Sequence, residues 1–184
     1  ADNPAVAEHE RAWLYLQSGD LEAAERGFTA ALRISVEFHP SDAGLGFVEL
    51  SRGASAQAVA WFDDALSRAP TYVPALVGRG EALLTVGRVS EAIASFEAAV
   101  AADPSLTPLR RRVEDLRFTD LMAQVTRARA ARAAGRDDDA RVAYERLIAA
   151  SPDSGFLYIE LADIEQREGH GEAALRRLEQ AIEL

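Results

Sequence analysis

The sequence predicts an all-α fold made of about five helix–turn–helix repeats. Three sets of aligned residues carry this prediction, and neighbours within each run lie 34 residues apart. The glycines are Gly19, Gly53 and Gly87 and, after a break in the register, Gly135 and Gly169. The other two sets are Ala24, Ala58 and Ala92, and Phe28, Phe62 and Phe96. Since glycine makes up about 7% of average sequences, such a column of five is not a coincidence.

The segment from Val73 to Pro104 shows the unit most clearly, as two short helices joined at Gly87. Glycine just after a helix adopts the left-handed conformation that a tight reversal needs. Pro40 and Pro74 occupy equivalent places near helix starts, where proline costs no backbone hydrogen bond. The predicted repeats cover about residues 5–38, 39–72, 73–106, 121–154 and 155–184.

The register breaks after Pro104, because the next turn glycine, Gly135, comes 14 residues late. Between Pro108 and Ala134 there is no glycine and no further proline, which predicts one elongated helix over about 108–134. Residues 107–120 would then extend the first helix of the fourth repeat. The alternative is a break near Phe118–Asp120, with a fresh helix capped there.

A 34-residue unit with a small residue in its first helix (helix A) and Ala then an aromatic in its second (helix B) resembles the tetratricopeptide repeat family. The resemblance covers nearly the whole chain. It implies one right-handed α-solenoid domain over residues 1–184, and a platform for protein–protein contact rather than an enzyme. The basic residues are all Arg and alanine is abundant, which is typical of a GC-rich bacterial source.

Charge and composition exclude several classes of function. The chain carries a formal net charge of −10, with −8 on residues 1–104, +5 on 105–136 and −7 on 137–184. An acidic body repels phosphate, so we expect no general nucleic-acid binding. The absence of Cys excludes disulfides and thiolate metal sites, and no apolar run is long enough for membrane insertion. The chain starts without Met and stops short of a closing Pro, so we expect both ends to be trimmed, and an exported origin stays open.

The resemblance implies that the A helices line a concave groove that holds the partner. We expect the partner-binding residues to be His9, Trp13, Leu16, Phe47, Leu50, Val77, Glu81, Leu84 and Arg129. That part of the groove is more polar in the last two repeats, where the matching positions are Val125, Arg132, Ala133, Ile159, Asp163, Gln166 and Arg167. A contiguous apolar surface usually marks an interaction site. The alternative is that the aliphatic members pack one A helix on the next.

One subtype of the family can be tested by residue type. Tetratricopeptide domains that clamp the terminal carboxylate of chaperones use Lys and Asn on successive A helices. This chain has no Lys, and its one Asn is Asn3. The clamp positions hold His9, Trp13, Gly44, Pro74 and Gly78, so we do not expect this subtype.

The elongated helix suggests a second function. Leu109, Val113 and Leu116 lie at helical spacing with several Arg around them. They either pack on the preceding repeat or mediate self-association, with Arg facing the acidic surface of a second copy in a homodimer.

Other candidate chemistry is weak. His9, His39 and His170 have no metal-ligand spacing, and Asp137–Asp139 are acids at a helix start, where they complement the helix dipole. We expect no metal, no cofactor and no catalytic residue. The predicted function is a scaffold for a protein or peptide partner, with a homodimerisation element as the alternative. An RNA-binding pentatricopeptide array is disfavoured by the acidic charge.

Overall fold

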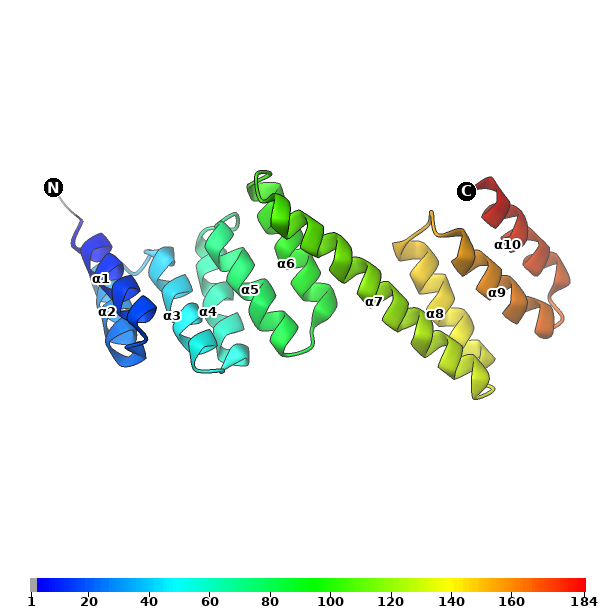
Figure 1. Cartoon of the computed structure of the whole chain (residues 1–184), viewed down its shortest axis with the longest axis horizontal. Coiled ribbons are helices and arrows are strands. Elements are labelled where there is room, and N and C mark those ends of the chain that lie inside the picture. Colours follow the sequence, from blue (N-terminus) through cyan, green and yellow to red (C-terminus); the bar gives the residue numbers. More distant parts are fainter. Residues whose placement is uncertain (1–2) are drawn as a thin grey trace. The chain divides into compact units, whose positions relative to one another are not determined.

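The structure, a computed structural model, describes residues 3–184, and within them it contains ten helices and no strand (Figure 1). The helices are α1 (Pro4–Ser18), α2 (Leu21–Ile34), α3 (His39–Ser51), α4 (Ser55–Arg68), α5 (Val73–Thr85), α6 (Val89–Ala102), α7 (Thr107–Ala133), α8 (Asp137–Ala150), α9 (Gly155–Arg167) and α10 (Gly171–Glu183). The predicted all-α class and its helix–turn–helix repeats are confirmed.

Helix α7 is continuous over 27 residues and matches the elongated helix predicted for about 108–134 (Figure 1). No break occurs near Phe118, so the alternative of two helices is wrong. The reason is compositional, because the segment after Pro108 holds neither proline nor glycine to interrupt the backbone hydrogen bonds.

Compact packing divides the chain into two units, of which unit 1 ends at Leu116 and unit 2 spans Arg117–Leu184. Each unit has core clusters of its own. The boundary falls inside α7, at the stretch that the late turn glycine adds to the repeat pattern. A single functional domain over residues 1–184 stays a prediction.

The five turn glycines all adopt the left-handed conformation, with φ between 73° and 84°. They are the residues with positive φ in the part of the chain that the structure describes. At Gly53 the backbone N–H donates to Leu50, and the next N–H, of Ala54, donates back to Glu49. These bonds satisfy carbonyls at the end of α3 and reverse the chain into α4.

The core of unit 1 is built from phenylalanine rings that press on glycines. Phe62 on α4 is fully buried, and its ring reaches Gly46 on α3 and Gly78 on α5. A Cβ atom placed on Gly78 would lie 2.4 Å from this ring. The repeat period therefore sets two kinds of position in the core. At one a phenylalanine ring is buried, and at the other the facing helix has a glycine because a side chain would clash with that ring.

Unit 2 uses the same ring position differently. Tyr144 on α8 takes the place of the phenylalanines and is fully buried, among Val125, Leu157 and Leu161. Val125 has no exposed surface, so its assignment to the groove is wrong. Its side chain belongs to the same core cluster as both leucines, where apolar packing replaces contact with water.

Asp42 on α3 is an ionisable group that is only 3% exposed. Its carboxylate accepts a hydrogen bond of 3.0 Å from Arg68 on α4. Burial raises the pKa of Asp42 to about 6, with smaller contributions from the charges of Asp64 and Glu37, while Arg68 opposes the shift. The folded state therefore takes up a proton at a higher pH than the unfolded chain does.

This raised pKa predicts a pH dependence of stability. The contribution of Asp42 is largest below its unfolded pKa of 3.8 and is lost as the pH rises through about 6. On acidification from pH 7.5 to 4.5, we expect the wild type to gain about 2 kcal/mol relative to Asp42→Asn. Urea unfolding of both proteins at several pH values measures this. If the unfolding free energies of the two proteins changed in parallel with pH, Asp42 would not be the group responsible for the pH dependence.

Candidate partner-binding faces

Three consecutive A helices of unit 1, α1, α3 and α5, lie next to one another in the order of the chain. Eight of the predicted groove residues are on them, and each is half-buried. These eight form the A-helix face of unit 1: His9, Trp13, Leu16, Phe47, Leu50, Val77, Glu81 and Leu84. The inner sides of the apolar members pack on the two core clusters of this unit. Part of each side chain remains open to solvent.

Aromatic rings connect α1 to α3 along this face. Trp13 and Phe47 meet edge to face, with their ring centroids 5.6 Å apart. Phe47 in turn lies 5.0 Å from Phe62 in the same geometry, and Trp13 lies 6.3 Å from Phe28. The face therefore rests on buried rings, which is the kind of rigid aromatic surface that protein interfaces favour.

His9 is fixed by contacts from α2, from α3 and from the loop that joins them. Its Nδ1 lies 3.1 Å from the hydroxyl oxygen of Ser41, which is fully buried. Its ring packs on Phe28 and Phe38. Burial lowers the pKa of His9, with Glu10 opposing the shift. At neutral pH this side chain is therefore an uncharged part of the face.

Glu81 supplies the one acidic side chain of the A-helix face, and it is neutralised within unit 1. Arg112 on α7 forms two hydrogen bonds with it, one of them 2.9 Å long, and its guanidinium lies over the Phe96 ring at 5.0 Å. Arg112 occupies the repeat position at which Gly44 and Gly78 face the earlier rings. Here the ring stacks on a cation instead of pressing on a glycine.

The apolar stripe of α7 lies on the core of unit 1. Val113 is 6% exposed, and Leu109 and Leu116 are half-buried against the same cluster. These contacts agree with the first of the two alternatives from the sequence, in which the stripe packs on the preceding repeat. Self-association through these three residues stays a prediction.

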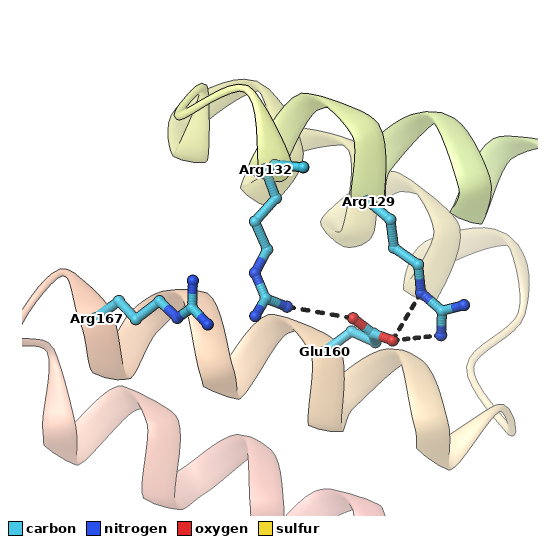
Figure 2. A pocket seen from close by; sticks show the side chains of 5 residues that line it. Arg129, Arg132, Glu160 and Arg167 are labelled. Carbon is cyan, nitrogen blue, oxygen red and sulfur yellow. Dashed lines mark hydrogen bonds and ion pairs between the residues drawn. The ribbon is translucent and has the colours of Figure 1, made fainter.

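In unit 2 the A helices carry Arg129 and Arg132 at repeat positions where unit 1 has mostly apolar side chains. Figure 2 shows Arg129 and Arg132 reaching from α7 toward Glu160 on α9, with Arg167 on the same helix as Glu160. Together with Ala133 these residues line a cavity of about 370 Å³, the arginine pocket. Of the predicted groove residues, Arg129, Arg132, Ala133 and Arg167 are thus brought together.

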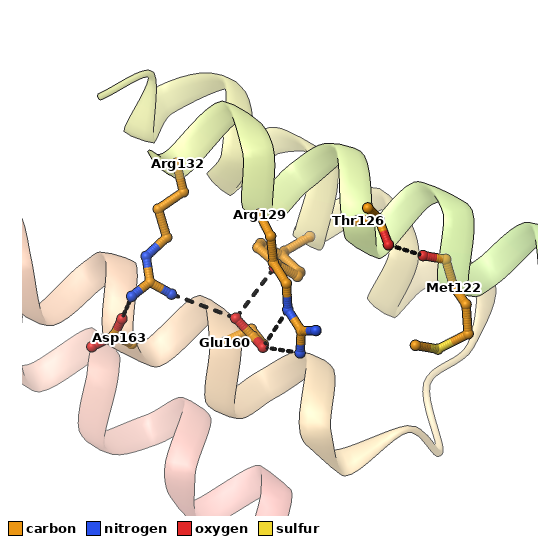
Figure 3. A network of polar contacts seen from close by, with 7 residues as sticks. Met122, Thr126, Arg129, Arg132, Glu160 and Asp163 are labelled. Atoms are coloured by element: carbon orange, nitrogen blue, oxygen red, sulfur yellow. Dashed lines mark hydrogen bonds and ion pairs between the residues drawn. The ribbon is translucent and has the colours of Figure 1, made fainter. Parts of the chain in front are cut away.

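Glu160 is the centre of the polar network in this pocket (Figure 3). Arg129 donates to Oε1 from Nε at 2.9 Å and also from Nη2, while Arg132 lies 3.5 Å from Oε2. The Tyr144 hydroxyl donates to Oε2 at 3.3 Å. Burial, together with the charge of Glu160, raises the pKa of Tyr144 to about 12, and the hydrogen bond with Glu160 raises the pKa of Arg129.

Glu160 is not among the site residues predicted from the sequence. It falls in the same repeat column as Gly44 and Gly78, whose role is to face a buried ring. The signal was available, because the ring position changes from Phe to Tyr144 where the facing position changes from Gly to Glu160. A hydroxyl and a carboxylate appear together, since a buried tyrosine needs a hydrogen-bond partner.

Family models described as tetratricopeptide repeat match residues 9–74, 49–107 and 121–164, which is well over half of the chain. The chain belongs to the tetratricopeptide repeat family. Its bacterial source, expected from composition, stays a prediction. No curated protein matches this tetratricopeptide repeat chain in sequence.

Solved structures share the fold at low sequence identity. The first tetratricopeptide domain of Spaghetti (RPAP3), bound to the HSP90 peptide SRMEEVD, has a TM-score of 0.61 at 16% identity, over 65% of this chain and 98% of that one. The P58(IPK) domain has a TM-score of 0.61 at 20% identity, over 96% and 50%. YrrB, described as having an unusual peptide-binding site, has a TM-score of 0.50 at 18% identity, over 97% and 85%. At such identities the likeness concerns the fold.

A metal site and a membrane-spanning helix were both predicted to be absent. Among residues 3–184, no group of three or more His, Cys, Asp or Glu side chains could hold a metal ion. Within the same range, no helix combines the length and the apolar character that crossing a bilayer requires.

Proposed function

We propose that this chain is a non-catalytic protein-interaction scaffold, and that the A-helix face of unit 1 holds an apolar segment of a partner protein. The observation that carries the proposal is the face itself. Three consecutive A helices each expose part of their large apolar or aromatic side chains, which rest on buried rings. Half-exposed apolar residues that adjoin one another in this way favour association with another apolar surface.

The charges of unit 1 favour a particular kind of segment. Within the face Glu81 is paired with Arg112, so the contact surface has little net charge. Residues 1–116 as a whole carry 10 Arg and 17 Asp or Glu side chains. An acidic surround attracts basic residues, so we infer a partner segment with apolar anchors flanked by Arg or Lys.

The family and the fold support this function. Tetratricopeptide arrays commonly serve as platforms for protein contact, and two of the similar structures are described with a bound peptide or a peptide-binding site. A clamp for a chaperone terminus is not part of the proposal, because this chain has His9, Trp13 and glycines at the clamp positions. We expect a modest affinity, on the order of micromolar, as for interfaces of limited area.

A peptide-display selection against the whole chain tests the proposal. Peptides that bind the wild type should lose at least about tenfold in affinity when Trp13 and Phe47 are both changed to Ala, because aromatic anchors dominate such interfaces. Fluorescence anisotropy with a selected peptide measures this. Leu14→Ala is the matched control, since Leu14 neighbours Trp13 on α1 but is 65% exposed outside the face.

A second variant separates binding from folding. Trp13 and Phe47 also pack on buried rings, so their loss lowers stability as well. Leu84→Gln keeps the length of a half-buried side chain and makes it polar. We expect weaker peptide binding with helicity unchanged by circular dichroism. Undiminished binding to both variants would show that the peptides bind elsewhere.

A further inference from the structure

The arginine pocket of unit 2 is chemically different from the A-helix face of unit 1. Three guanidinium groups, of Arg129, Arg132 and Arg167, line it together with the carboxylate of Glu160. Asp163 borders it and pairs with Arg132 and Arg167. Three positive charges against two negative ones leave an excess of one positive charge. This excess lies in a unit whose formal charge is −3, since residues 117–184 carry 10 Arg and 13 acids.

The three arginines are not equally engaged. Arg129 and Arg132 are tied to Glu160, which the Tyr144 hydroxyl also contacts. Arg167 is different, because its side chain is 58% exposed and its Nε lies 3.5 Å from Asp163. Within residues 3–184 it donates no side-chain hydrogen bond, whereas Arg129 and Arg132 both donate to Glu160. The contacts between α7 and α9 are thus made without Arg167, which leaves its donors available.

We propose that the arginine pocket binds a carboxylate side chain, an Asp or Glu of the partner protein. The excess of one positive charge matches the single negative charge of one carboxylate. A doubly charged phosphate would exceed it, and Glu160 and Asp163 would repel the phosphate more strongly. The planar guanidinium of Arg167 can donate two parallel hydrogen bonds to a carboxylate. The cavity of about 370 Å³ has room for a side chain of this size.

This inference rests on the proposed function, since it supposes that a partner protein contacts both units. It deepens that function by assigning the two units different chemistry. Unit 1 would take apolar anchors and unit 2 would take an acidic residue of the same or another segment. Charge pairing of this kind adds specificity more than affinity.

The test is a titration of the whole chain with N-acetylglutamate N-methylamide, which presents one side-chain carboxylate. Its neutral counterpart, N-acetylglutamine N-methylamide, is the control ligand. NMR follows the arginine Nε–Hε signals at low salt, because screening weakens exposed pairs. We expect saturable shifts at Arg129, Arg132 and Arg167 with the glutamate compound, half-complete on the order of 10 mM, and none with the glutamine compound.

Three variants sharpen the result. Arg167→Gln removes the excess charge and should weaken binding at least about fivefold. Arg136→Gln is the matched control, because this exposed arginine pairs with Asp139 outside the pocket, and its binding should be unchanged. Glu160→Gln raises the excess to two positive charges and should tighten binding severalfold.

Equal shifts with both compounds, or shifts spread evenly over all arginines, would overturn the assignment. Tighter binding of inorganic phosphate than of the glutamate compound would also overturn it, in favour of a phosphoryl group. The same titration on Trp13→Ala/Phe47→Ala should give unchanged shifts, since that face is in unit 1. A failure of the scaffold proposal and a failure of the pocket are therefore distinguishable.

Discussion

Phe62→Ala should destabilise unit 1 by about 3–5 kcal/mol, which is the range for removing a fully buried phenylalanine. The ring fills the space between α3, its own helix α4 and α5, where it contacts Gly46 and Gly78. Neither facing position can fill this space, because both are glycines. Chemical denaturation with helicity as the readout measures the loss.

The effect of Gly78→Ala on the free energy of unfolding should reverse its sign when the Phe62 ring opposite Gly78 is removed. In the wild type, Gly78→Ala places a Cβ atom 2.4 Å from the ring and should cost about 1–3 kcal/mol. In a Phe62→Ala background the clash is gone, and alanine should stabilise α5 by about 0.5–1 kcal/mol through its higher helix propensity. Since Phe62→Ala is itself severe, the milder Phe62→Leu provides a second background in which the cost should shrink.

Gly44→Ala is the control for this reversal. Gly44 faces Phe28 instead of Phe62, so its substitution should be equally harmful with and without the Phe62 change. A Gly78→Ala cost that does not depend on residue 62 would contradict the ring-on-glycine packing, because residues in direct contact must show coupled free energies.

Val125→Asp should unfold unit 2, with a cost above about 3 kcal/mol. Val125 has no exposed surface and lies in the core cluster with Leu157 and Leu161, so a carboxylate there would have no partner. Unit 1 has separate core clusters and should stay folded. Amide hydrogen exchange would then show lost protection in α8–α10 and retained protection in α1–α6.

This substitution also decides between the two assignments of Val125. If the side chain faced a groove, as expected from its repeat position, the aspartate would remain in water and the protein would tolerate it. Ala130→Asp, at an exposed position on the same helix, is the matched control and should be nearly neutral. Equal tolerance of both changes would restore Val125 to the groove.

The sequence was sufficient for the features that depend on one residue type at a fixed period. A glycine column predicts left-handed turns, and all five glycines have positive φ. The absence of glycine and of further proline between Pro108 and Ala134 predicts one long helix, and α7 is that helix. In these cases the backbone itself restricts which residue can stand at the position.

The sequence was insufficient where burial depends on what a neighbouring helix supplies. Val125 shares a column with His9 and Val77, which are half-buried, yet it is fully buried in a core cluster that includes two leucines of α9. Glu160 shares a column with glycines, and its role depends on a tyrosine hydroxyl and two arginines from other helices. The repeat period of a sequence does not say which side chains of other helices will lie beside a residue. For this reason the arginines of the pocket were predicted from the sequence, but Glu160 was not.

The most direct test of the scaffold account is hydrogen exchange of the whole chain with and without a display-selected peptide. Binding at the A-helix face predicts added protection on α1, α3 and α5, and the loss of this protection in the Trp13→Ala/Phe47→Ala protein. Protection confined to the B helices α2, α4 and α6, or protection that persists in that variant, would contradict the A-helix face as the binding surface.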